Sequence, residues 1–151
     1  MLFHSSHPST IISQSKAFFA LIYELCKVDF YSEHDIQCIE KYIPFTSLNS
    51  NDFIDGDYCS KPYLGREGEG VSFSIMNTDI QNDQNNLIYQ KRIEIQSVNL
   101  NIHTALSNYK INAYPIIGTF VMGEEFGGIY TRAGGIITDQ WAVYIPTYFR
   151  R

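Results

Sequence analysis

The side chains of this sequence that are best suited to chemistry are one thiol and one imidazole. Cys59 lies in a polar stretch where a thiol is accessible, and His103 is the only histidine deep within the folded region. Asp139 would then orient the imidazole, which gives the Cys–His–Asp arrangement of a thiol hydrolase. No protease signature surrounds Cys59, and these residues are selected by elimination. The thiol hydrolase is therefore kept as an alternative, and we predict no catalytic residues.

A second set of reactive side chains is acidic and lies in the polar stretch 46–70. Carboxylates concentrated in one loop can bind calcium or attract a basic partner. The regularly spaced oxygen ligands and the closing glutamate of a calcium loop are absent, which favours a partner-binding surface. Two tyrosines in the same stretch are candidate anchors for that partner. The predicted partner-binding residues are Asp52, Asp55, Asp57, Tyr58, Tyr63, Glu67 and Glu69.

Other chemical motifs are excluded by their spacing. The glycine-rich segment 65–70 lacks the Lys-Ser or Lys-Thr of a phosphate-binding loop, its two glutamates would repel an anion, and a strand follows it. The histidines have no HxH or HxxxH spacing and the cysteines form no CxxC pair, which argues against zinc. We expect neither a metal nor a cofactor.

Size and charge limit the classes of protein that this chain can belong to. A chain of 151 residues fits a single domain, 1–151, and buries roughly 70% of its unfolded surface without a disulfide or metal. Its net charge is −5, and its eleven basic residues are scattered, whereas nucleic-acid binding requires clustered Lys and Arg. We therefore expect a basic protein partner and no nucleic acid.

The cysteines and the apolar runs indicate where the protein is found. An odd number of widely spaced cysteines, with no basic region typical of a secretory signal, suggests a reducing compartment. The apolar run 17–23 is too short to span a bilayer. The sequence predicts a cytoplasmic protein that does not associate with membranes.

Two helices are expected near the N-terminus. Apolar residues at three- and four-residue steps predict the first over 13–28, with Ser9, Thr10 or Ser13 as its cap. Ser32 followed by Asp35 resembles a capping box and predicts the start of the second. Pro44 would end this second helix.

The remainder of the chain is expected to consist of strands after an irregular stretch, 46–70. Antiparallel pairs are predicted between 71–76 and 87–95, and between 127–131 and 136–145 across a glycine turn. Segment 97–109 fits a helix or a strand, and its asparagines favour the strand. Pro115 would lie at an edge or a first position. The expected strands are 71–76, 87–95, 97–109, two within 111–122, 127–131 and 136–145.

These elements predict an α+β protein in which two N-terminal helices pack on a mainly antiparallel sheet. The aromatic residues of the last strands are expected to lie mainly in the core, since alternating strand residues usually do. Exposed, they would instead bind a partner or a sugar. These aromatic residues are Tyr130, Trp141, Tyr144 and Tyr148.

In length, acidity and Asn- and Ile-rich composition the chain resembles the immunity proteins that accompany bacterial polymorphic toxins, including those of contact-dependent growth inhibition. The resemblance implies a small cytoplasmic toxin inhibitor, not an enzyme, whose acidic loop covers the active site of a basic toxin domain. No residue is carried over from that family, because its members share no motif. A structural or assembly subunit that uses the aromatic strands is a further alternative.

Overall fold

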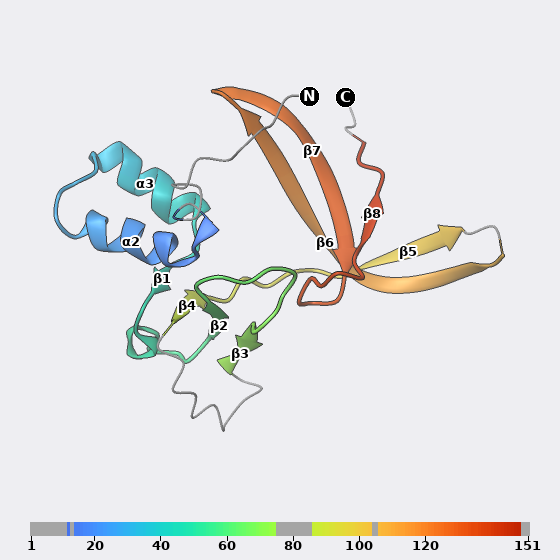
Figure 1. Ribbon diagram of the computed structural model, residues 1–151, viewed down its shortest axis with the longest axis horizontal. Coiled ribbons are helices and arrows are strands. Elements are labelled where there is room, and N and C mark those ends of the chain that lie inside the picture. The colour runs from blue at the N-terminus through green and yellow to red at the C-terminus, as the bar shows by residue number, and fades with distance from the viewer. Residues whose placement is uncertain (1–11, 13, 75–85, 104–105, 149–151) are drawn as a thin grey trace, which may run out of the picture. The chain divides into compact units, whose positions relative to one another are not determined.

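Figure 1 shows the protein as a computed structural model. The structure describes residues 12, 14–74, 86–103 and 106–148. The chain divides into two compact units, Met1–Ile93 and Glu94–Arg151, and each is described by itself. The first unit holds both described helices, and each unit has its own four-stranded sheet.

The two helices are α2 (Ala17–Cys26) and α3 (Glu33–Tyr42). The predicted capping box of α3 is confirmed: Ser32 Oγ accepts from the Asp35 N–H at 3.2 Å, and the Asp35 carboxylate accepts from the Ser32 N–H at 3.3 Å. The helix ends two residues before Pro44, as expected. The candidate caps Ser9, Thr10 and Ser13 lie outside the described residues, and α2 begins after Lys16, whose side chain makes no capping bond.

The first sheet corrects the expectation that 46–70 is irregular. This stretch holds two strands and a 3₁₀ turn, because pairing with a strand far along the chain satisfies its polar backbone. The strand order is β1-β4-β2-β3, and all pairs are antiparallel. The elements are β1 (Thr46–Ser47), η1 (Ser50–Asp52), β2 (Tyr58–Pro62), β3 (Ser72–Phe73) and β4 (Leu87–Lys91).

The strand order also shows that the predicted hairpin between 71–76 and 87–95 is wrong. Both strands exist, but β2 lies between β3 and β4 and pairs with each of them. Helix α2 packs on β1 and β4, which buries Ala20 and Ile88 to 1% exposure each. A row of aromatic rings with centroids 5.1–5.3 Å apart completes this core: Tyr23, Phe45, Phe53, Tyr58 and Tyr89.

The second sheet has the order β5-β6-β7-β8. The preference for a strand at 97–109 is confirmed, whereas the two strands expected within 111–122 are a single long one. The glycine turn predicted between the last two strands was placed too early in the sequence. Strand β7 extends to Gly134, and β8, which follows later in the sequence, pairs with it. The strands are β5 (Val98–His103), β6 (Asn108–Met122), β7 (Glu125–Gly134) and β8 (Val143–Ile145).

Strand β6 changes its partner along its length. Its residues up to Ala113 pair with β5, and from Tyr114 onwards they pair with β7. The result is two ribbons that point in different directions (Figure 1). Pro115 lies just beyond the end of the β5 pairing, so β6 is a local edge there, and a residue without an N–H is tolerated.

The part of the β6–β7 hairpin from Gly118 to Gly128, here called the distal ribbon, has only two strands. Its turn is Gly123-Glu124, and Gly123 has a φ of +67°, as the first residue of a tight hairpin turn requires. At its base, Gly118 lies opposite Tyr130, and the tyrosine ring occupies the space that a side chain at Gly118 would need.

Because two strands cannot cover one another, apolar residues of this unit stay exposed. The expectation that the aromatic residues lie in the core is wrong for Trp141, Tyr144 and Tyr148, which are 79%, 74% and 87% exposed. Tyr130 is half-buried, between Phe120 at 5.3 Å and Tyr144 at 5.9 Å between ring centroids.

The α+β class, with N-terminal helices packed on antiparallel strands, is confirmed. A single domain over 1–151 stays a prediction, since the contacts separate two units. No helix within the described residues is both long and apolar enough to cross a membrane.

Replacing Ser32 with alanine is expected to lower the free energy of unfolding by about 1 kcal/mol, because α3 loses its cap. The hydrogen bonds from the Ser32 hydroxyl and backbone N–H lower the pKa of Asp35 below its ordinary value of 3.8. The stabilisation that comes from the ionised Asp35 carboxylate is separate from that of the cap; it is present above that value and is lost as the pH falls through the lower pKa of the folded state. Urea denaturation followed by far-UV circular dichroism at several pH values measures it, with Ser97→Ala as the exposed control.

Gly118→Ala is expected to destabilise the second unit by about 1–3 kcal/mol, because its Cβ would lie 2.2 Å from Tyr130 Cε1. Hydrogen–deuterium exchange of the β6 and β7 backbone amides, read by mass spectrometry, reports unfolding of this unit. In a Tyr130→Ala background the penalty should largely disappear. Gly135→Ala, whose Cβ makes ordinary contacts, is the control, and an equal loss in both variants would refute the explanation.

Candidate functional site

The predicted acidic surface lies at two separate places. Asp52, Asp55 and Asp57 precede β2, whereas Glu67 and Glu69 follow it in the connection to β3. At about 3.3 Å per residue, the strand separates Asp57 from Tyr63 by about 20 Å. All five carboxylates are exposed, but they do not form one face.

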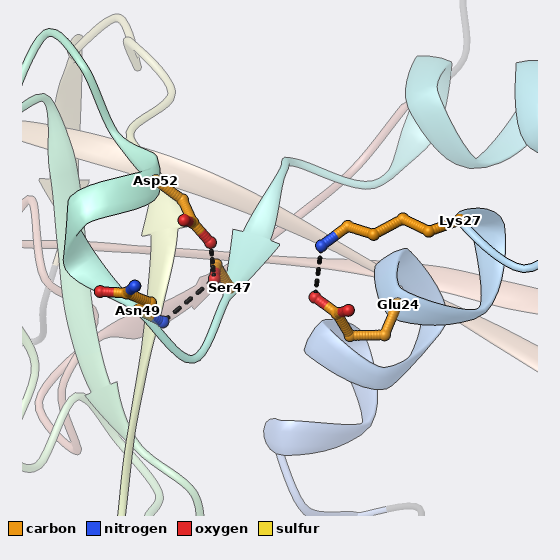
Figure 2. Close-up of polar contacts among 5 residues, drawn as sticks. All are labelled: Glu24, Lys27, Ser47, Asn49 and Asp52. Atoms are coloured by element: carbon orange, nitrogen blue, oxygen red, sulfur yellow. Dashed lines mark hydrogen bonds and ion pairs between the residues drawn. The ribbon is translucent and has the colours of Figure 1, made fainter.

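Two of these carboxylates already have partners in the protein. The Ser47 hydroxyl donates to Asp52, and the Asn49 N–H donates to Ser47 Oγ at 3.0 Å, which fixes the turn after β1 (Figure 2). Figure 2 also shows the ion pair between Lys27 Nζ and Glu24 Oε1, 2.6 Å apart, on the nearby helix. Arg92 Nη1 lies 3.9 Å from Asp57 Oδ1. Asp55 makes no such contact with any described residue.

The two tyrosines predicted as anchors are half-buried. The ring of Tyr58 packs between Phe53 and Tyr89, with centroids 5.3 Å from each, and therefore contributes to the core. Tyr63 joins two segments through its backbone: its N–H donates to the Asn86 carbonyl and its carbonyl accepts from the Lys16 N–H, both at 2.8 Å.

The residues of the alternative thiol site each have other partners within their own unit. Cys59 is buried in β2, and its thiol donates to the Gln90 carbonyl at 3.5 Å. His103 belongs to the other unit, is exposed, and lies with Nδ1 2.9 Å from Asn108 Oδ1. The Asp139 carboxylate accepts from the Trp141 N–H at 2.9 Å. Among the described residues no group of His, Cys, Asp and Glu is arranged to hold a metal ion.

A basic site that was not predicted lies between the start of α2 and the connection from β2 to β3. Lys16 Nζ donates to the Gly65 carbonyl at 2.8 Å, and Arg66 Nη2 donates to Gln14 Oε1 at 3.5 Å. A hollow of about 550 Å³, open to solvent, lies here and is lined by Gln14, Leu64, Gly65 and Arg66. Lys16 and Gly65 are 49 residues apart, so no local pattern could have joined them. The glycine-rich segment 65–70 was the one feature of the sequence that pointed to this place.

A third cation, Lys61, is held near this site by hydrogen bonds across the first sheet. Lys61 Nζ donates to Gln90 Oε1 at 2.6 Å, and Gln90 Nε2 donates to Thr46 Oγ1 at 2.9 Å. The Thr46 hydroxyl in turn donates to the Pro44 carbonyl at 2.8 Å. Partial burial, and secondly the positive charge of Lys61, lower the pKa of Lys16. The fold therefore holds two ammonium groups close enough to repel one another.

Comparison with known families identifies the chain. The model described as glutathionylspermidine synthase preATP-grasp matches residues 7–150. The match covers nearly the whole sequence, and the chain therefore belongs to the glutathionylspermidine synthase preATP-grasp family. No curated protein and no solved structure matches it.

This family corrects the predicted function. The resemblance to immunity proteins is wrong, and the predicted toxin-neutralising role is therefore wrong as well. The resemblance depended on length, acidity and composition, which unrelated small proteins share. The family also gives no support to the two alternative functions, a thiol hydrolase and an assembly subunit. The family takes its name from an enzyme, of which the part called preATP-grasp is matched.

Gln90→Leu is expected to lower the free energy of unfolding by about 1–3 kcal/mol, because half-buried Lys61 loses its acceptor and Thr46 loses a donor. Urea denaturation measures the change. Gln37→Leu, at an exposed helical glutamine, is the control and should change stability by less than about 0.5 kcal/mol. If both variants lost the same stability, the hydrogen-bond chain would not be the cause.

Proposed function

We propose that this chain is a non-catalytic, substrate-recognising module of an amide ligase of the glutathionylspermidine synthase type. The observation that carries the proposal is the family match over residues 7–150. The name preATP-grasp supports the inference that a neighbouring module uses the ATP. In this proposal the chain recognises a substrate and does not carry out the ATP-dependent step.

The substrate that we assign to the module is the polyamine. Spermidine carries several positive charges at neutral pH, and the chain has a net charge of −5. The exposed carboxylates before β2 supply suitable acceptors: Asp55 makes no contact with a described residue, and the Arg92–Asp57 pair is long at 3.9 Å. Exposed ion pairs contribute about 0.2–1 kcal/mol each, so the expected affinity is weak, with a dissociation constant in the millimolar range or higher.

The proposed location is the cytoplasm, where ATP, glutathione and spermidine are present. The three cysteines are free thiols, which suits a reducing compartment.

Calorimetric titration with spermidine tests this proposal. We expect millimolar, salt-sensitive binding and no release of phosphate from ATP by the chain alone. The double variant Asp55→Asn, Asp57→Asn should weaken binding about threefold to tenfold, because two acceptors lose their charge. Glu33→Gln with Glu40→Gln removes the same charge from exposed positions of α3 and should change affinity less than about twofold.

Two outcomes would contradict the proposal. ATP hydrolysis by the purified chain would show that it is itself catalytic. Equal weakening by the two double variants would show that spermidine responds only to net charge.

A further inference from the structure

The basic site beside α2 has properties that the polyamine does not explain. Three cations, Lys16, Lys61 and Arg66, lie at or near one hollow, and each donates to a neutral acceptor. The ion pairs among the described residues are Lys27–Glu24 and Arg92–Asp57, so none of the three cations is neutralised there. A polyamine would be repelled from this site.

The carboxylates nearest in sequence, which were expected to repel an anion, reduce this positive charge but do not cancel it, because two glutamates stand against three cations. Glu67 and Glu69 are exposed, and neither forms an ion pair with a described residue. The Glu69 N–H donates to the Arg66 carbonyl at 3.0 Å, which closes the turn between them. Within the part of the chain that the structure describes, this backbone bond shapes the connection, and the three cations have no carboxylate partner.

Hydrogen bonds to the described residues use only part of the donors at this site. An ammonium group has three N–H donors and a guanidinium has five. Lys16 Nζ makes one hydrogen bond to the described residues, and so does Arg66 through Nη2. The remaining donors suit the oxygens of a carboxylate or phosphate, because charge-assisted bonds to such anions are the stronger kind.

The hollow beside these donors is large enough for more than a simple ion. Its volume of about 550 Å³ is in the range of sites for small organic molecules. Gly65 is one of its lining residues, and a Cβ there would lie 3.2 Å from Pro62 Cγ and 3.8 Å from Lys16 Nζ, so a side chain at this position would contact the ammonium group. Leu64, which is 59% exposed, gives the hollow one apolar wall.

We infer that this hollow binds the anionic end of a small molecule, a carboxylate or a phosphate, through Lys16 and Arg66. Lys61, fixed by Gln90, adds positive potential without direct contact. The repulsion that lowers the pKa of Lys16 is relieved when the anion arrives, so binding raises that pKa. This site is distinct from the carboxylates before β2, and the inference does not depend on the proposed polyamine role.

Titration of the intact chain with three probes tests the inference and separates the two sources of anion. The probes are reduced glutathione, its diethyl ester, which lacks both carboxylates, and inorganic phosphate. Binding of glutathione but not of the ester assigns a carboxylate, whereas binding of phosphate alone assigns a phosphate-bearing ligand. If neither glutathione nor phosphate binds, the inference is overturned.

Variants then locate the site. Lys16→Met with Arg66→Gln is expected to weaken binding of the anion about tenfold, because two charged donors are lost. Lys41→Gln with Lys110→Gln removes the same charge at two exposed positions elsewhere and should change affinity by less than about twofold. Spermidine binding should survive the first double variant, so failure of this inference is distinguishable from failure of the proposed function. Equal effects of the two double variants would overturn the site.

A second measurement does not depend on how the variants fold. Competitive acetylation of the unmodified chain, read by mass spectrometry, gives the reactivity of each lysine. The lowered pKa makes Lys16 more reactive than exposed Lys110, and the bound anion should protect Lys16 severalfold. Unchanged reactivity of Lys16 at a saturating anion concentration would contradict the assignment.

Discussion

The first unit depends on one requirement: polar groups buried between its strands must be hydrogen-bonded. Strand β4 is paired on both sides, and the side chain of Gln90 on it connects Lys61 on β2 with Thr46 on β1. Thr46 is almost fully buried, and its hydroxyl must find partners there. The same amide that satisfies the sheet also sets the position of an ammonium group. Packing and electrostatics are thus linked through one side chain.

Features determined by neighbouring residues were predictable from the sequence. The capping box of α3 depends on a few consecutive residues, and it was found where the pattern placed it. The α+β class followed from the change in periodicity after the second helix. Sequence reasoning therefore recovered the fold class and most of the strands.

Features determined by distant residues were not predictable. Strand β2 contains a serine, a lysine and a proline, and it becomes a strand because β4, about thirty residues later, pairs with it. The basic site has the same origin, since Lys16 meets Gly65 only through tertiary structure. The acidic residues were read as one loop because sequence proximity does not reveal that a strand separates them. Composition gave no specific information about the family.

The distal ribbon affects how the protein behaves in concentrated solution. Both its strands have one unpaired edge, and the apolar side chains of Phe120, Val121 and Phe126 are exposed on it. Its charged residues are Glu124 and Glu125, at the turn. Open strand edges are commonly guarded by charge, because like charges oppose intermolecular pairing. The two glutamates at the turn therefore oppose edge-to-edge association of neighbouring chains along the exposed strands.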